Sequence, residues 1–309
     1  MTLLSVADLS ARYSTSSGFV YAVDAVNFDL NSGESMGIAG ESACGKSTLG
    51  LSIIKTLLGG IATGRIEFHG KSLLDMDESE FDRFIRWKEI SMIFQGAMNS
   101  LDPVFTIRNQ FLELLNQHGF KGDKINVINN AVESVGLNQS VLSKYPHQLS
   151  GGMKQRVIIA LALILKPKLV IADEPTTALD VLTQSQIINM LKKLKNDGMS
   201  FMFITHDLAV LSEIADKIGI MYGGQMIEFG TSHEIYKDPK HPYTKALLDS
   251  IPRLRGGPPK YIPGVPPSLL DPPTQCRFIE RCPLAVEKCK QVPPEFQTHS
   301  GYVRCWLYE

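Results

Sequence analysis

The chain has 309 residues, is 44% hydrophobic and carries 31 basic residues against 32 acidic ones. This size and apolar content are sufficient to bury at least one sizeable core. A net charge of -1 gives no overall field that would attract a nucleic-acid backbone, so nucleic acid is not an expected partner. The longest apolar run, residues 157–165, is far short of the ~20 residues that span a bilayer. Since residues 1–11 show no signal-peptide pattern, we expect the chain to stay in the cytoplasm.

Alternating strand and helix patterns precede residue 240 and predict an α/β domain with a largely parallel sheet. Strands are expected over residues 20–30, 35–39, 90–94, 169–172, 201–204 and 217–221. Helices are expected over residues 46–57, 126–135, 151–165, 181–195 and 208–215. Residues 222–225 contain two successive glycines and predict a tight hairpin turn before a strand at 226–229.

Composition changes near residue 240, because 13 of the 17 prolines lie at or after Pro239. Each proline removes a backbone donor and disfavours helix at the residue before it. Residues 252–273, which hold eight prolines, are therefore expected to form an extended connector without a regular helix or central strand. We place one domain at residues 1–238 and a C-terminal extension at 239–309.

The first motif with clear chemistry is a phosphate-binding loop. It follows an expected strand and precedes an expected helix, which is the context that such a loop requires. Backbone N–H groups and the helix N-terminus would face the phosphates, Lys46 would reach the terminal phosphates, and Ser47 would bind magnesium. The alternative is an ordinary strand–turn–helix junction, which an eight-residue match in this context disfavours. The nucleotide-binding residues assigned here are Gly40, Glu41, Ser42, Ala43, Cys44, Gly45, Lys46, Ser47 and Thr48.

A second motif is the apolar run at 169–172, which ends in Asp173 and Glu174. A buried strand that stops at charged residues places them at the carboxyl edge of the sheet, where α/β proteins bind ligands. Asp173 would hold magnesium through water, and Glu174 would be the general base for the attacking water. Taken alone, Asp173 and Glu174 are better explained as charged residues that keep the end of a strand in contact with water. The phosphate loop elsewhere in the chain makes the catalytic interpretation the better one.

The segment Leu-Ser-Gly-Gly-Met-Lys-Gln at 149–155 resembles the signature motif of ABC ATPases, and it precedes the acidic strand end as in that family. Ser150 would cap a helix whose N-terminus carries partial positive charge, and Gly151 and Gly152 would let a phosphate approach. Taken alone, the triplet at 150–152 is also compatible with an ordinary helix start. In ABC ATPases this end meets the γ-phosphate held by the other subunit of an ATP-bound dimer.

The resemblance implies roles for further residues. Tyr13 matches the aromatic residue that stacks on adenine, with Tyr21 as a nearby rival, and Gln95 matches the loop that senses magnesium and contacts the permease. Asp180 lies in the dimer-contact loop at 178–180, and His206 matches the switch histidine that binds the γ-phosphate and orients the water. The implied catalytic residues are Glu174, His206 and Gln95, the implied magnesium ligands are Ser47, Gln95 and Asp173, and the implied nucleotide contacts near the signature are Ser150, Gly151, Gly152, Gln155 and Asp180.

The implied fold is an ABC-type P-loop nucleotide-binding domain with a RecA-like core, an antiparallel β subdomain and a helical signature subdomain at about 96–165, followed by a small Pro/Cys-rich extension. Two loop residues depart from the usual pattern: Ala43 replaces a glycine and Cys44 replaces a serine. Gly40, Gly45, Lys46 and Ser47 are all present, so we expect activity. Cys44 also raises the hypothesis that the site is oxidisable.

The run at 238–248 and the connector after it resemble the C-terminal extension of dipeptide and oligopeptide importer ATPases. This implies a peripheral subunit at the cytoplasmic face that hydrolyses ATP to power peptide uptake. The implied partners are a paralogous ATPase chain, two permease subunits and an extracytoplasmic substrate-binding protein. Oligosaccharide or nickel uptake is the alternative within the family. The alternative from another class is a DNA-repair or translation ATPase, but neither tandem cassettes nor nucleic-acid-binding insertions are visible.

Four of the five cysteines follow the connector. Disulfides are rare in a reducing cytosol, so shared metal binding is the better chemical interpretation, and four thiolates suit zinc or iron–sulfur. The spacing matches neither the usual zinc pairs nor the common ferredoxin run. The family resemblance favours a 4Fe-4S cluster, with zinc, four ordinary buried thiols and a redox switch as alternatives. The predicted ligands are Cys276, Cys282, Cys289 and Cys305.

Overall fold

The computed structural model describes residues 1–251 and 261–309. These residues form two compact units, which are described separately: unit 1 contains residues 1–75 and 203–309, and unit 2 contains residues 76–202. Residues 252–260 of the expected connector lie outside the described residues. Its described part, 261–273, has no helix and makes one bridge, between Val20 and Leu270, which fits the expectation of an extended segment.

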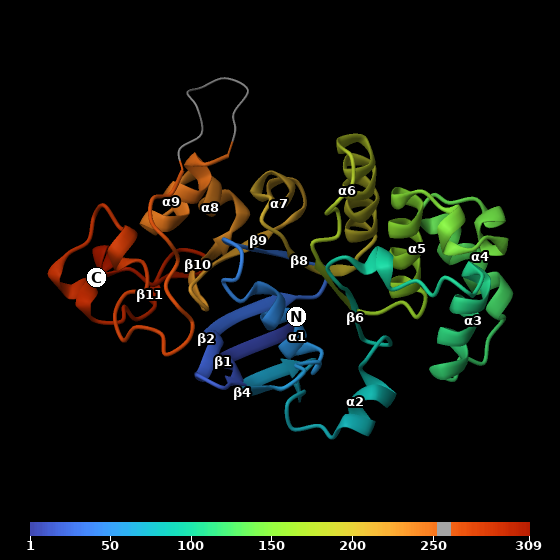
Figure 1. Ribbon diagram of the computed structural model, residues 1–309, viewed down its shortest axis with the longest axis horizontal. Helices are drawn as coiled ribbons and strands as arrows, with labels where there is room; N and C mark the ends of the chain where they lie inside the picture. Colours follow the sequence, from blue (N-terminus) through green and yellow to red (C-terminus); the bar gives the residue numbers. More distant parts are fainter. Residues whose placement is uncertain (252–260) are drawn as a thin grey trace. The chain divides into compact units, whose positions relative to one another are not determined.

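Unit 1 contains an antiparallel sheet with the strand order β2-β1-β4-β5 (Figure 1). The strands are β1 (Thr2–Thr15), β2 (Gly18–Asn31), β4 (Gly60–Phe68) and β5 (Lys71–Ser72). Of these, sequence patterns predicted only β2. β1 was missed because the register shifts between Val6 and Leu9 interrupt its apolar alternation, although both side chains are buried.

A second sheet in unit 1 supports the phosphate loop. Its strands follow the order β11-β12-β10-β9-β3, with β3 parallel to β9 and the remaining pairs antiparallel. They are β3 (Ser35–Ala39), β9 (Lys217–Tyr222), β10 (Gln225–Thr231), β11 (Phe296–Gln297) and β12 (Tyr302–Val303). Gly223 and Gly224 have φ values of 56° and 85°, which confirms the predicted hairpin turn.

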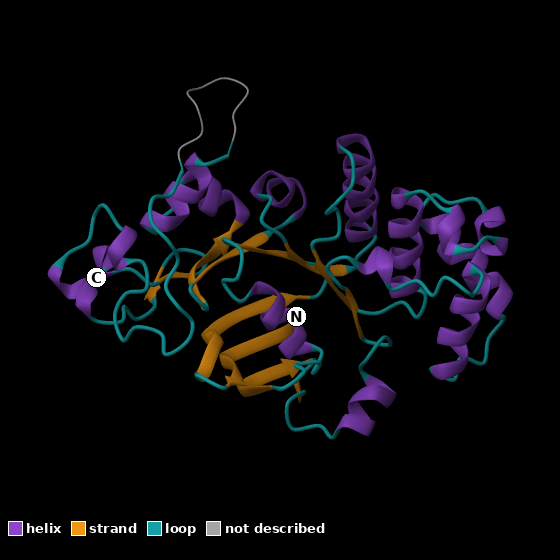
Figure 2. Ribbon diagram, in the orientation of Figure 1, coloured by secondary structure: helices purple, strands orange, loops and turns teal. Residues whose placement is uncertain are grey.

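The helices of unit 1 are short (Figure 2). They are α1 (Lys46–Ile53), α7 (Leu208–Ile214), α8 (Ser232–Lys237) and α9 (Pro242–Asp249), with 3-10 turns η4 (Ile279–Arg281), η5 (Glu287–Lys290) and η6 (Trp306–Tyr308). α1 ends earlier than predicted, and Lys55 just beyond it has φ 54°, a left-handed conformation that does not continue a helix. α8 and α9 were not predicted, because α8 has only 6 residues and α9 begins at a proline within the proline-rich part of the chain.

Unit 2 pairs β6 (Ile90–Ile93) in parallel with β7 (Leu169–Asp173). Its helices are α2 (Glu78–Phe84), α3 (Ile107–Gln117), α4 (Lys124–Ser134), α5 (Gly151–Leu163) and α6 (Val181–Asn196), with 3-10 turns η1 (Ala97–Asn99), η2 (Gln139–Ser143) and η3 (Pro146–Gln148). The division between the units falls within β8 (Ser200–Ile204). Among the described residues, no helix has the length and apolar character needed to cross a membrane.

Candidate active site

The phosphate loop is shaped by two glycines that no other residue can replace. Gly40 and Gly45 have φ values of 152° and 101°. A Cβ at Gly40 would lie 2.2 Å from the carbonyl oxygen of Met221, and one at Gly45 would lie 1.9 Å from that of Ala22. These distances leave no room for a side chain, so the loop packs directly on the backbone of its neighbours.

The N-terminus of α1 has the features of an anion-binding site. Gly45 is its N-cap and no described side chain caps it, so its first N–H groups are available to a ligand. No acidic residue lies in the first turn, and Ser47 is half-buried there. The Lys46 ammonium donates to the carbonyls of Gly40 and Glu41, both at 2.8 Å. The loop residues therefore fit the triphosphate and magnesium of a nucleotide.

The two unusual loop residues have different structural consequences. Ala43 has φ 62°, a left-handed conformation in which glycine is less strained. Cys44 is buried, with its sulfur 3.7 Å from the Lys46 ammonium. Burial raises the pKa of the Cys44 thiol, and the nearby Lys46 only partly opposes this. Thiolates, not thiols, react with oxidants, so the raised pKa argues against the hypothesis of an oxidisable loop.

Unit 1 also carries the predicted adenine and switch residues. Tyr13 is half-exposed on β1, and its ring lies against Gly60, where an added Cβ would be 2.8 Å away. The backbone N–H of its rival Tyr21 donates to Leu269 in the connector, at 2.8 Å. His206 is exposed immediately beyond β8. A half-exposed tyrosine ring is suitable for stacking on a base, so the Tyr13 assignment stays a prediction.

Unit 2 brings Gln95 and the two carboxylates to one edge of its parallel strands. Ile93 of β6 lies opposite Ala172 of β7, so the residues that follow both strands emerge on the same side. Gln95 is exposed there, whereas Asp173 is buried. Glu174 has φ 51° and its carboxylate accepts a hydrogen bond from the Thr177 hydroxyl at 2.9 Å. The arrangement suits a magnesium-bound water next to a general base.

The signature segment caps α5 as expected. The hydroxyl of Ser150 accepts a hydrogen bond from the Met153 N–H at 3.3 Å. Gly151 is exposed, and Gly152 packs so closely on Thr183 of α6 that a Cβ would lie 2.5 Å from its methyl group. The predicted contact Gln155 is buried in α5, with 5% of its surface exposed. A glycine-lined helix start, capped by Ser150, therefore has its first glycine exposed to solvent, as a phosphate contact requires.

Asp180 lies at the N-cap of α6, next to the signature segment. Its carboxylate accepts from the Thr183 N–H at 3.0 Å and from the Thr183 hydroxyl at 2.7 Å. These hydrogen bonds lower the pKa of Asp180. The loop that contains Asp180 is thus fixed in a charged state close to the glycines of the signature.

The predicted site residues therefore fall into two sets. Tyr13, the phosphate loop and His206 belong to unit 1. The set in unit 2 contains Gln95, the signature residues, Asp173, Glu174 and Asp180. The roles assigned to individual residues remain predictions.

Sequence reasoning missed two residues that contact the phosphate loop. The Glu41 N–H donates to the Tyr243 hydroxyl at 2.9 Å, and Arg281 donates to both oxygens of the Glu41 carboxylate. Tyr243 lies in the run at 238–248 that marked the subfamily, so a signal existed for it. Arg281 precedes Cys282 and gave no signal of its own.

The four C-terminal cysteines are free thiols that lie near one another. The Cys276 N–H donates to the Cys289 carbonyl at 3.0 Å. Burial raises the pKa of Cys276 to about 11, and the charges of the other three cysteines add to the rise. Among the described residues, no group of three or more His, Cys, Asp or Glu side chains is placed to hold a metal ion. The predicted 4Fe-4S site therefore finds no support in this arrangement.

Comparison with known proteins agrees with this geometry. The ABC transporter family model matches residues 23–177. A solved ATP-binding cassette in a dimeric post-hydrolysis state, bound to ADP and Pi, is 29% identical with a TM-score of 0.66, over 74% of this chain and 99% of that one. The chain belongs to the ABC transporter family of ATPases, so ATP with Mg²⁺ is its expected substrate. The predicted α/β cassette fold is confirmed.

Further matches define the branch of this family. The model of the oligopeptide/dipeptide transporter C-terminal region matches residues 227–289. A dipeptide transport ATP-binding protein (DppD) of Caldanaerobacter subterraneus is 45% identical, over 99% of this chain and 97% of the relative. An oligopeptide transport ATP-binding protein (OppD) of Haemophilus influenzae is 43% identical, over 99% and 97% respectively. The chain is thus an ABC ATPase of the dipeptide and oligopeptide transport branch.

Proposed function

We propose that this ATPase powers the uptake of dipeptides or oligopeptides through a membrane permease, at the cytoplasmic face of the membrane. The observation that carries the proposal is similarity over 99% of the chain to a dipeptide transport ATP-binding protein, including the C-terminal region. ATP would bind between two ATPase subunits and close them, and its hydrolysis would let them open. We propose a paralogous chain as the second subunit.

We assign the chemistry of hydrolysis as follows. Lys46 and the start of α1 hold the phosphates, while Ser47, Gln95 and Asp173 hold magnesium, which supplies charge neutralisation when bound. Glu174 removes a proton from the attacking water, and His206 orients that water and the γ-phosphate. Ser150, Gly151 and Gly152 of the second subunit cover the γ-phosphate. Two observations support this assignment. The start of α1 has no side-chain cap and no acidic residue in its first turn, and the parallel strands β6 and β7 end at the same edge of the sheet.

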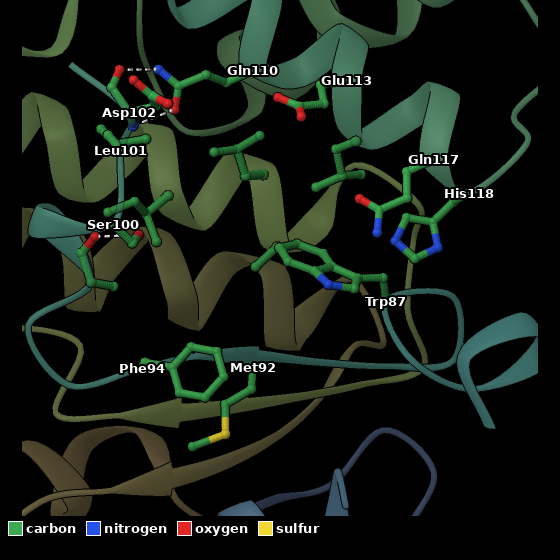
Figure 3. A pocket seen from close by; sticks show the side chains of 15 residues that line it. Trp87, Met92, Phe94, Ser100, Leu101, Asp102, Gln110, Glu113, Gln117 and His118 are labelled. Atoms are coloured by element: carbon green, nitrogen blue, oxygen red, sulfur yellow. Dashed lines mark hydrogen bonds between the residues drawn. The ribbon is translucent and has the colours of Figure 1, made fainter. Parts of the chain in front are cut away.

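A groove in unit 2 supports a permease partner. Its volume is about 420 Å³, and it is lined by α3, α5 and the segment that follows β6 (Figure 3). Apolar side chains, among them Trp87, Phe94 and Leu114, form most of its wall, and Asp102 and Glu113 add negative charge. Phe94 lines the groove and is followed in the sequence by Gln95, a predicted magnesium ligand. We propose that a short helix of the permease, with apolar and basic side chains, occupies this groove.

The docking proposal is tested by the substitution Leu114→Asp. Leu114 is a half-buried residue of α3 that lines the groove, so a carboxylate there would oppose an apolar helix. We expect stimulation of ATP hydrolysis by the reconstituted permease to fall by about tenfold or more. Ile125→Asp, at a 59% exposed apolar residue outside the groove, is the matched control. Equal stimulation of the Leu114 variant and the wild type would contradict the docking site.

The substrate class is tested with the complete transporter in lipid vesicles. ATP hydrolysis is measured with the binding protein loaded with dipeptides, longer peptides, oligosaccharides or nickel. Stimulation by peptides alone supports the proposal, and stimulation by oligosaccharide or nickel replaces its substrate. If no partner or cargo changes the rate, a non-transport ATPase becomes the better assignment. Purification of the complex with one or two kinds of ATPase chain decides between the homodimer and the proposed heterodimer.

We also propose that the four C-terminal cysteines take up a 4Fe-4S cluster, for which their side chains would have to rearrange and lose protons. The proposal rests on the residue type and number, four cysteines between residues 276 and 305, and not on their present arrangement, which does not form a metal site. Iron and acid-labile sulfide are measured on protein purified without oxygen. A value near four of each per chain supports the cluster, bound zinc favours the alternative metal, and absence of all three leaves ordinary thiols.

A further inference from the structure

The phosphate loop contains a carboxylate that phosphate binding does not require. Glu41 is the second residue of the loop, which otherwise favours anions through Lys46 and the start of α1. A negative charge at this place repels the phosphates of ATP unless a cation compensates for it. The partners of Glu41 therefore affect how the loop receives a nucleotide.

Arg281 of the C-terminal extension compensates for this charge. Its two terminal nitrogens donate to the two Glu41 oxygens at 2.8 Å and 2.9 Å, across 240 positions of sequence. The side chain of Arg281 is 4% exposed and that of Glu41 is 24% exposed. A bidentate pair with this little exposure is stronger and more directional than a surface ion pair.

Arg281 is itself held firmly in place. Its Nε donates to the Pro263 carbonyl at 2.8 Å, and its terminal nitrogens also donate to the Ile262 carbonyl and to the Tyr222 hydroxyl. The guanidinium lies 5.5 Å from the ring centre of Tyr222. These contacts fix the position of the guanidinium, so the pair constrains Glu41 and leaves Arg281 little freedom to follow it.

The backbone of Glu41 is held by a neighbouring group. Its N–H donates to the Tyr243 hydroxyl, and the Tyr243 ring packs on Tyr222 and Phe278 at 4.6 Å and 5.4 Å between ring centres. Burial raises the pKa of Tyr243, so the phenol remains neutral and able to accept this hydrogen bond. The backbone N–H and the carboxylate of Glu41 thus both form hydrogen bonds with residues that follow the hairpin at 222–225.

We propose that Arg281 is a positioning residue for ATP binding, which neutralises Glu41 and holds the phosphate loop in the conformation that accepts the nucleotide. Its first effect is electrostatic, because it removes the repulsion between the Glu41 carboxylate and the phosphates. Its second effect is preorganisation, because a loop already held in place loses less conformational entropy when ATP binds. Arg281 contacts the loop and not the reacting atoms, so its influence should appear mainly in nucleotide affinity.

The first test is Arg281→Gln in the full chain, with the dissociation constant of Mg-ADP measured by calorimetry and the KM and kcat for ATP measured separately. Leaving the carboxylate without its cation should weaken Mg-ADP binding by about tenfold or more, as expected for loss of a charged hydrogen bond. KM for ATP should rise by more than kcat falls. Affinity equal to that of the wild type would overturn the proposal.

A second variant separates charge from folding. Glu41→Gln removes the repelling charge and should weaken Mg-ADP binding less than Arg281→Gln does. The double variant Glu41→Gln with Arg281→Gln should bind more tightly than Arg281→Gln alone, because no uncompensated carboxylate remains. If the ion pair had only a structural role, the double variant would bind Mg-ADP at least as weakly as the weaker-binding single variant. That result would refute the electrostatic role.

The chain offers a matched control. Arg304 also forms a buried ion pair in the C-terminal extension, with Glu295 at 2.7 Å, and its side chain is 8% exposed. It donates to the Ala25 carbonyl and does not contact the phosphate loop. Arg304→Gln should lower the thermal unfolding midpoint as Arg281→Gln does, yet leave Mg-ADP affinity unchanged. A loss of affinity as large as that of Arg281→Gln would show a general effect of destabilising the extension.

Discussion

The phosphate loop and the C-terminal extension are both parts of unit 1, but they are built in opposite ways. Consecutive residues form the loop, and its shape follows from two glycines with positive φ. The extension is held by contacts that link distant positions, such as Arg281 with Glu41 and Arg277 with Asp24. The phosphate loop is therefore encoded locally, whereas the contacts of the extension that support it are encoded over long range.

The largest effect that tests this contrast should be a fall in kcat when a proposed catalytic residue is replaced. Glu174→Gln removes the proposed general base and should lower kcat by on the order of 10²–10⁴ while ATP still binds. The change keeps the size of the side chain, so the thermal unfolding midpoint should stay near that of the wild type. Near-normal hydrolysis would remove Glu174 from the mechanism.

The next effect concerns stability and comes from the extension. His241 is fully buried and caps α9, where its Nδ1 accepts the Tyr243 N–H at 3.0 Å. Burial lowers the pKa of His241 to about 3 from its ordinary value of 6.5, and the charge of Lys245 adds to this. The unfolded chain therefore binds a proton that the folded chain does not, and stability is lost as pH falls below about 6.5.

Substitution of His241 by asparagine tests this pH dependence, because asparagine also accepts an N-cap hydrogen bond but does not titrate. Between pH 7 and pH 5 the wild type should lose about 2 kcal/mol more unfolding free energy than His241→Asn, as measured by urea denaturation. Burial raises the pKa of the neighbouring Glu228, which acts in the opposite sense but in both proteins. Parallel pH profiles for the two proteins would contradict the prediction.

The smallest effect should come from removing a helix N-cap side chain. Its cost in unfolding free energy should be equal in the two units, because the capping contact is local. Thr231 caps α8 and Thr106 caps α3, each by accepting an N–H at 3.4 Å. Substitution of either by alanine should lower the free energy of unfolding by about 1 kcal/mol. The two variants are compared by urea denaturation. A much larger cost for Thr231→Ala would show that the short-range contacts of unit 1 also depend on the extension.

Sequence patterns predicted the elements in which local chemistry and structure coincide. The phosphate loop, β3, β7 and the Gly223–Gly224 hairpin all appear where short-range rules place them. β1 escaped because register shifts interrupt the alternation of its side chains, and β4 escaped because only Ile66 and Phe68 of its side chains are buried. α3 was not predicted, although its buried residues Ile107, Phe111 and Leu115 follow a helical period.

The cysteines illustrate the limit of residue type as a guide to chemistry. Four thiols did gather in space, as clustering in the sequence suggested, but their arrangement among the described residues does not match a metal site. Tyr243 and Arg281 lie far from the loop in sequence, and no spacing rule connects them with Glu41. Long-range partners of this kind become visible only once the chain is folded.

The short strands β11 and β12 have a consequence for the solubility of the protein. β12 pairs with β10 at Glu228 and Phe229, and β11 pairs in turn with β12. Without them, β10 would present unpaired N–H and C=O groups along an open edge, which is the geometry that recruits a strand from another molecule. A chain truncated before residue 296 should therefore aggregate, so the tail protects the sheet from intermolecular pairing.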